Sequence, residues 1–176
     1  MPNATTEMSR IVPGRSPSVP LIAGAAASLL STLALFLCGR PDGHAGAAPT
    51  NATSQWVWGR RALAKSSLSL RYTLVGYAVH HAMSTLWAAA HRRMHPLRAR
   101  SVPLGRTLAE AAGTAAMAFA VDYTVTPRRL RPGFEHHLSA GSMLMVYAAF
   151  ALGLAAAFRV MDEQQHRARR GGGFAP

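Results

Sequence analysis

The chain is short of cysteine, lysine and acidic residues. Among its 176 residues there is one cysteine, Cys38, one lysine, Lys65, and seven aspartates and glutamates. A single cysteine cannot form an internal disulfide, so a disulfide framework is excluded. Charged residues make up 15% of the chain, whereas about 25% is typical of soluble domains. The composition therefore argues against an ordinary soluble surface, and the length suits one domain.

Short catalytic and cofactor-binding motifs are also missing. There is no Ser–His–Asp signature, no Walker pattern and no glycine-rich phosphate loop. Haem b held by two histidines needs them on separate helices at equal depth, and only one apolar segment has interior histidines. Scattered metal-ligating residues show no fixed ligand spacing: His44, Asp122, Glu135, His136 and His137. We expect no enzyme activity, no metal and no cofactor.

Basic residues are plentiful, and they number 19 against seven acidic ones, for a net charge of +12. Such a balance occurs in nucleic-acid-binding proteins. Here the arginines bracket apolar segments and form no face interleaved with aromatic residues, so membrane flanks are the preferred interpretation. We expect no nucleic-acid partner, and a soluble basic binder is the weaker alternative. Heavy use of alanine, arginine, glycine and proline favours a GC-rich bacterial genome.

Four apolar segments stand out, each near the 20 or so residues that a helix needs to cross a hydrocarbon core about 30 Å thick. They are residues 18–39, 71–91, 104–125 and 139–158. The first exceeds the roughly 7–15 apolar residues of a signal peptide, so we expect a retained helix. Only helices or closed barrels satisfy their backbone in lipid. The sequence predicts an all-α fold, an integral membrane four-helix bundle over residues 18–159.

The segments outside these helices are polar. We expect residues 1–17 to be a disordered tail and residues 160–176 to be a mobile basic tail. Proline and glycine predict an irregular first half for the outer loop 40–70. Trp56 and Trp58 suit the headgroup region, so residues 54–66 are interpreted as a short interfacial helix. An ordinary loop with buried tryptophans is the alternative.

The basic residues predict an orientation. With four spans both termini share one side, and that side holds eleven arginines, against seven arginines and one lysine opposite. The positive-inside rule therefore places both termini in the cytoplasm. The short basic turn 92–106 is the strongest local signal, because short loops count most.

Small residues recur at spacings of four in three segments, and close packing through small residues drives helix association in lipid. We expect a tight bundle, in which one small face can be left for a second copy of the chain. The sets are Gly24, Ser28 and Thr32; Ala109 and Gly113 with Ala112, Ala116 and Ala120; and Ala149, Gly153 and Ala157.

Polar residues form one seam of the second segment, which the helical repeat predicts to face protein or water. The seam is Thr73, Tyr77, His80, Ser84, Trp87 and His91. His81 points about 100° away from it. Two interpretations are open for His80 and His81: neutral imidazoles hydrogen-bonded inside the bundle, or a proton relay or ligand contact.

Two acids, Glu110 and Asp122, lie in the third segment. They are about 18 Å apart along a helix, so they cannot act as a dyad. Glu110 is four residues from Arg106, an ion-pair spacing. An antiparallel hairpin of the second and third segments predicts that Asp122 pairs with Arg71, or else with the arginines of 128–131.

Three stretches resemble small multi-pass inner-membrane proteins of proteobacteria that carry no established function. They are "NATSQWVWGRRA", "LRYTLVGYAVHHAMSTLWA" and "VDYTVTPRRLRPGFEHHLS". The resemblance implies a bacterial inner membrane and brings no catalytic residue. The residues that carry this resemblance gather in the half of the predicted bundle that faces away from the cytoplasm. This favours a polar pocket there or, alternatively, a rigid outer cap. The candidate pocket residues are His80, His81, Asp122, Glu135, Trp56 and Trp58.

These observations predict a non-enzymatic multi-pass inner-membrane protein, an accessory or assembly subunit. Its expected partners are the lipid bilayer and a second copy of the chain or another membrane subunit. The alternative is a small proton- or solute-translocating protein that uses the histidine pair.

Overall fold

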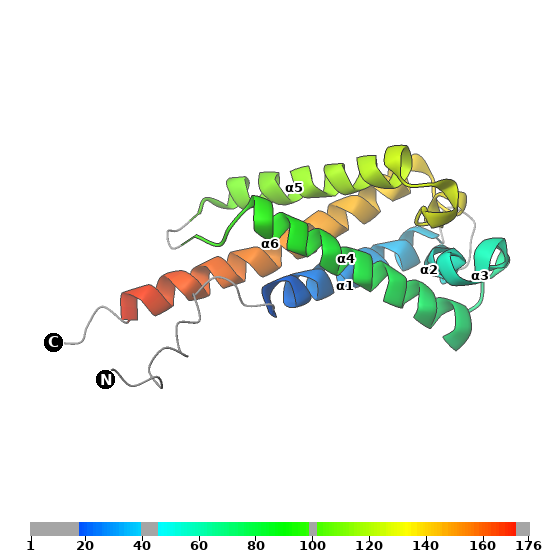
Figure 1. Cartoon of the computed structure of the whole chain (residues 1–176), viewed down its shortest axis with the longest axis horizontal. Coiled ribbons are helices and arrows are strands. Elements are labelled where there is room, and N and C mark those ends of the chain that lie inside the picture. The colour runs from blue at the N-terminus through cyan, green and yellow to red at the C-terminus, as the bar shows by residue number, and fades with distance from the viewer. Residues whose placement is uncertain (1–17, 40–45, 99–101, 172–176) are drawn as a thin grey trace, which may run out of the picture.

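The computed structural model describes residues 18–39, 46–98 and 102–171, and every regular element in these ranges is a helix. Four long helices form a bundle (Figure 1). They are α1 (Ser18–Gly39), α4 (Val75–Met94), α5 (Leu104–Ala120) and α6 (Ala140–Gly171). The predicted all-α class and helical bundle are confirmed.

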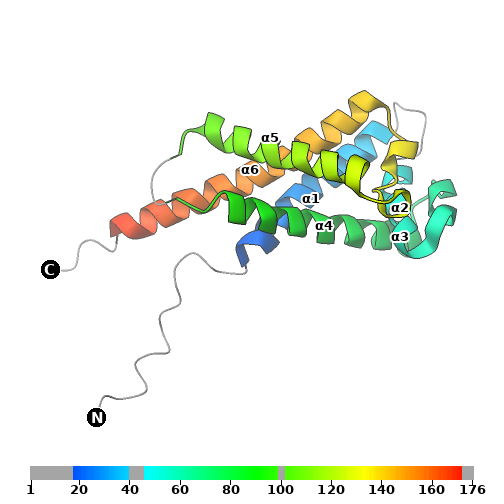
Figure 2. The same ribbon diagram turned by 45° about the horizontal axis from the view of Figure 1, so that its top comes forward.

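The first helix lies at the centre of the contacts. α1 packs against both α4 and α6, and α5 packs mainly against α6. α5 comes close to α4 near the turn that joins them and diverges from it farther along (Figure 1). The start of α1, the end of α6 and the α4–α5 turn lie at one end of the bundle, here called the terminal end (Figure 2). The short helices lie at the opposite end, called the cap end.

The observed bounds match the prediction for α1 and extend it for α6. A π-helical turn, Leu70–Leu74, precedes α4, and another, Val121–Val125, continues α5. The expected mobile tail from residue 160 is wrong up to Gly171, which is helical. An ion pair from Arg159 Nε to Glu163 Oε1, 2.6 Å, and a hydrogen bond from the Arg98 backbone N–H to Asp162 Oδ1, 2.8 Å, stabilise this extension. Residues 1–17 and 172–176 lie outside the described ranges.

Short helices build the cap end. They are α2 (Ala48–Thr53), α3 (Gln55–Trp58) and three 3₁₀ turns, Gly59–Ala64, Arg128–Leu130 and Phe134–His136. The irregular loop expected before residue 54 is wrong over α2, which is helical and buried. Pro49 lies in its first turn, where a missing N–H costs no helical hydrogen bond. The helix predicted over 54–66 is divided at Gly59, where φ is 62°.

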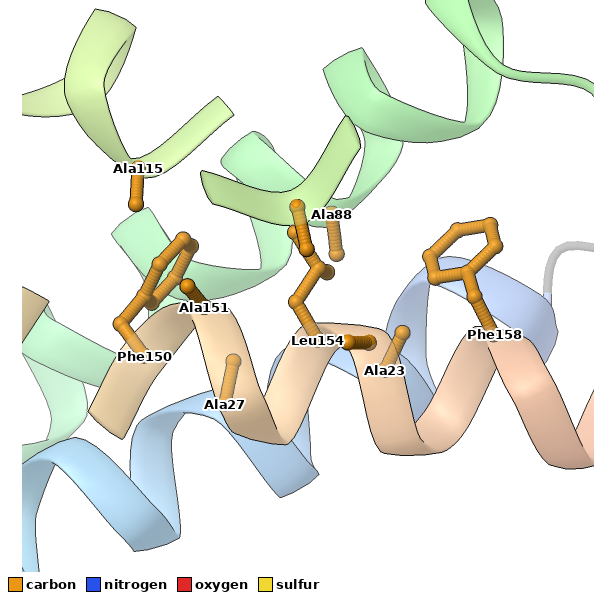
Figure 3. Close-up of a cluster of buried hydrophobic side chains, with 10 residues drawn as sticks. Ala23, Ala27, Ala88, Ala115, Phe150, Ala151, Leu154 and Phe158 are labelled. Carbon is orange, nitrogen blue, oxygen red and sulfur yellow. The ribbon is translucent and has the colours of Figure 1, made fainter. Parts of the chain in front are cut away.

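The main core cluster of the bundle is made mostly of small side chains. Seven of the ten residues in this buried cluster are alanines, and the other three are Phe150, Leu154 and Phe158 (Figure 3). A second buried cluster holds larger side chains, Leu35, Phe134, Leu138 and Val146 with Cys38. Many other large apolar side chains point outward. On α1 the leucines at 21, 29, 33 and 37 are each more than half exposed, and Leu144 on α6 is 72% exposed. The main core of the bundle is therefore rich in alanine, and its outer surface is rich in leucine.

Glycines set two of the helix crossings. A Cβ on Gly24 would lie 2.5 Å from Thr85 Cα on α4. A Cβ on Gly153 would lie 2.6 Å from the Ala26 carbonyl oxygen on α1. The small-residue packing predicted for the first and fourth segments is thus present. In the third segment Gly113 has no atom within 4 Å of its Cβ position, because this face of α5 points away from the bundle and is left open.

We predict opposite effects for the same substitution at two helical glycines. Glycine to alanine in a helix interior gains about 0.8–1.0 kcal/mol, and Gly113→Ala should gain much of this because its face is open. Gly153→Ala must push apart the backbones of α1 and α6, so we expect it to destabilise the fold by about 1–3 kcal/mol. Thermal unfolding of the purified variants measures both effects. Equal stability of the two variants would contradict the close crossing.

Candidate functional site

A cavity lies inside the bundle where α4 and α5 diverge. Its volume is ≈ 60 Å³, counted as the space open to the centre of a water molecule. Its walls come from α1, α4, α6, the end of α5 and the cap. Most of the lining is apolar, and it includes Val79, Met83, Trp87, Phe134 and Phe150.

A few polar groups converge on this cavity. They are Ser31, Thr53, His80, Ser84, Asp122 and Tyr147. Apolar walls with a small number of placed polar groups are the usual composition of a small-molecule site. The predicted polar seam of α4 does turn inward, since Ser84 and His91 are buried and His80 lines the cavity.

The two histidines contact serines of α1. His80 Nε2 lies 2.8 Å from Ser31 Oγ, and His81 Nδ1 lies 2.8 Å from Ser28 Oγ. Each hydroxyl also lies within hydrogen-bond distance of a carbonyl one turn earlier on α1. A hydroxyl has one hydrogen, so when it donates to the carbonyl the histidine nitrogen must donate to it. Both rings therefore join α4 to α1, and His81 does so outside the cavity.

Asp122 is held by a tyrosine and not by arginine. Tyr147 on α6 donates its hydroxyl to Asp122 Oδ2 at 2.7 Å. The predicted pair with Arg71 is wrong, because α4 and α5 diverge at this end, and the Arg71 guanidinium lies 4.5 Å from the Trp58 ring centroid. Arg131 is also engaged elsewhere, since it donates to the Tyr123 carbonyl at 2.9 Å. In the described part of the chain no cationic side chain forms an ion pair with Asp122.

The cavity brings together three of the six predicted pocket residues, His80, Asp122 and Trp56. Trp56 also directs its Nε1–H toward the Arg131 carbonyl at 3.4 Å. Glu135 lies apart from the cavity lining and accepts a long hydrogen bond from Tyr123 at 3.4 Å. Trp58 donates to the Arg71 carbonyl at 3.0 Å, so it belongs to the cap and not to the cavity.

Glu110 is the centre of a separate charge cluster at the terminal end. Arg106 Nε lies 3.0 Å from Glu110 Oε1, which confirms the pair predicted from the spacing of four. Arg98 adds a two-pronged contact, with its two guanidinium nitrogens 3.2 and 2.9 Å from the two carboxylate oxygens. This second arginine was not predicted, because it comes from the turn and not from the helix surface.

Several of the central polar residues escaped the sequence analysis. Tyr147 is an isolated polar residue in an apolar segment, and that isolation is the signal that could have singled it out. Ser31 follows Ser28 by three residues, a spacing that puts both hydroxyls on one face of a helix. Asn51 is fully buried, and its side-chain amide donates to the carbonyls of Lys65 and Ser67 at 3.0 and 2.9 Å. Thr73 donates to its oxygen at 2.6 Å. Asn51 thus holds the loop that leads into α4.

Metal ligands do not gather in the described residues, where no group of three His, Cys, Asp or Glu side chains is placed to hold an ion. Of the scattered ligand types noted in the sequence, His44 lies outside those ranges. The chemistry available in the cavity is hydrogen bonding from His80, Ser84 and Tyr147 and the negative charge of Asp122.

We predict that Tyr147→Phe destabilises the bundle by about 1–3 kcal/mol, because it leaves the half-buried Asp122 carboxylate without its hydrogen-bond donor. Tyr77→Phe is the matched control. The Tyr77 ring packs on His81 with centroids 5.8 Å apart, and its hydroxyl has no hydrogen-bond partner among the described residues. Thermal unfolding of the two variants should separate them, and equal melting would show that the Tyr147–Asp122 bond contributes little.

Scans against protein-family models, curated proteins and solved structures match nothing to this chain. The similarity to small proteobacterial inner-membrane proteins therefore stays a prediction, and the geometry of the cavity and the bundle has to support the function.

Proposed function

We propose that the chain is an integral membrane protein in which all four long helices cross the bilayer. The observation that carries the proposal is the distribution of side-chain size, because the main buried cluster is mostly alanine while many leucines are exposed on the outside of the bundle. In water the large apolar side chains would be expected in the core. In lipid they can face the acyl chains, while small residues allow the helices to approach closely.

Helix length and composition give further support. Two of the described helices, Ser18–Gly39 and Ala140–Ala168, are long and apolar enough to cross a membrane. The other two are more polar, but their buried residues include Ser84, His91, Thr107 and Thr114, so polarity is turned inward. Their outward large apolar side chains are Leu70, Leu74, Leu86, Leu104, Leu108, Met117 and Val125.

The charge distribution supports an orientation with the terminal end in the cytoplasm of a bacterial inner membrane. The turn between α4 and α5 and the end of α6 carry the denser arginines, and basic residues in short loops favour the cytoplasmic side. The cap end would then face the periplasm.

A single-cysteine pair tests this topology. In a Cys38→Ser background, Ser66→Cys marks the cap end and Gln164→Cys marks the terminal end, and both positions are exposed. We expect a membrane-impermeant maleimide to label Ser66→Cys in intact spheroplasts, and Gln164→Cys only after the membrane is permeabilised. Labelling of both before permeabilisation, or release of the native chain from membranes by salt alone, would contradict four spans.

The role we infer is that of a non-enzymatic accessory or assembly subunit. Its interior polar groups are used to join helices, as the His80–Ser31 and Tyr147–Asp122 contacts do. One face of α5 is left open and small, and a second helix could approach it closely. The exposed residues of this face are Ala109, Ala112, Gly113, Ala116 and Ala120. The face supports association with a second copy or with another membrane subunit.

Gly113→Phe tests the accessory role without disturbing the bundle, because the Cβ position of Gly113 has open space around it. We expect the native chain, extracted in mild detergent, to have the mass of a complex, and the variant to have the mass of a monomer. Leu29→Phe, on an outward position of α1, is the control and should keep the native mass. Equal masses for all three proteins would remove the α5 face as an interface.

Proton or solute translocation is the second candidate, and one observation favours it: His80 and Asp122 line the same cavity. Reconstituted protein would then support a pH-dependent flux. Joint replacement His80→Gln and His81→Gln, or Asp122→Asn alone, should abolish that flux while the protein still inserts. If the native protein gives no more flux than empty liposomes, translocation is rejected and the accessory role is retained.

A further inference from the structure

A second cleft, separate from the cavity, lies at the cap end. It offers about 480 Å³ and is lined by Gln55, Gly59, Arg60, Leu63, Arg128, Arg129 and His136. None of these residues lines the cavity of His80 and Asp122. Three arginines and a histidine therefore share one cleft that neither the accessory role nor the transport alternative uses.

No acidic side chain balances this charge in the described part of the chain. The acids there are five, and all of them lie outside the cleft lining: Glu110, Asp122, Glu135, Asp162 and Glu163. Arg60, Arg128 and Arg129 are exposed and form no ion pair within those ranges. Three like charges around one cleft repel one another, and an anion between them would remove that cost.

The backbone that carries the arginines is held in place. The Gln55 side chain donates from Nε2 to the Arg131 carbonyl at 2.7 Å and so joins the two walls of the cleft. Gly133 packs so closely that a Cβ there would lie 2.8 Å from the Ala52 carbonyl oxygen. The walls come from residues 55–63 and 128–136, which are far apart in the sequence. The two backbone segments that carry the arginines therefore cannot separate without breaking this joint.

The shape of the cleft adds to the charge argument. Gly59 has φ 62° and no atom within 4 Å of its Cβ position, so the cleft is open beside the backbone. Arginine presents a planar fork of N–H donors that matches phosphate oxygens. Leu63 supplies an apolar wall next to the charged groups.

We propose that this cleft binds a phosphate group. The same chemistry is offered by inorganic phosphate and by the phosphodiester of an anionic lipid headgroup, and Arg128, Arg129 and Arg60 would hold it from different sides. This site is independent of the proposed subunit role, because it uses neither the α5 face nor the cavity.

The test uses the full chain in a neutral detergent and two probes, inorganic phosphate and short-chain phosphatidylglycerol, titrated by calorimetry. The cleft variant is Arg128→Gln with Arg129→Gln. The control is Arg93→Gln with Arg167→Gln, which removes two exposed arginines at the terminal end. Short-chain phosphatidylcholine is the zwitterionic reference.

We expect the cleft variant to bind the active probe at least about tenfold more weakly, as the loss of charge-assisted hydrogen bonds requires. The control variant should bind as the native chain does. If inorganic phosphate binds, a free anion is sufficient to occupy the cleft. If only phosphatidylglycerol binds, the ligand is a lipid headgroup. Both outcomes support the proposal.

Three results would overturn it: no binding of either probe by the native chain, equal binding by the cleft variant, or equal losses in the cleft and control variants. The last would show a general charge effect. Arg60→Gln, on the opposite wall, must reproduce the loss if the double variant unfolds, and native binding by it would also reject the site. Failure here leaves the topology and the mass of the complex untouched, so the two proposals fail separately.

Discussion

The close approach of α1 to its two neighbours is the constraint on which the rest of the bundle depends. Gly24 brings the backbone of α1 against α4 at Thr85, and Gly153 brings the backbone of α6 against α1 at Ala26. In the proposed lipid surroundings no hydrophobic force draws helices together, so short-range packing and hydrogen bonds have to hold them. At this separation the hydroxyls of Ser28 and Ser31 reach the rings of His81 and His80, which adds polar bonds to the same crossing.

Because α1 occupies the space between α4 and α6, α5 has to pack on α6 and diverges from α4. This divergence produces the cavity and explains why Asp122 meets Tyr147 and not Arg71. The cap then closes that end of the bundle, with Asn51 and Gln55 joining segments that are distant in the sequence. The same joint places the cleft arginines around one space. The interior and the cap are thus two consequences of one packing arrangement.

Sequence-based predictions are correct for interactions between residues close together in the chain and fail for those between distant residues. The Arg106–Glu110 pair and the inward seam of α4 were predictable, because helical spacing alone brings those residues together or turns them to one side. The predicted Arg71–Asp122 pair is wrong because an antiparallel hairpin implies contact along the whole length of α4 and α5, whereas the two helices diverge toward the cap end. The continuation of α6 past residue 158 was missed because the hydrophobic run ends there, while the helix is prolonged by Arg159, Asp162 and Glu163.

By itself the sequence determined the four long helices, their small-residue sets and their charged ends, because run length, spacing and charge are local properties of the chain. Only the tertiary structure decided which small face is buried and which is open, which serine meets each histidine, and which arginines share a cleft. Those outcomes depend on the order in which helices pack and on the angle at which α4 and α5 diverge. The packing order and this angle are not encoded in any local pattern, because both arise from contacts between residues far apart in the chain.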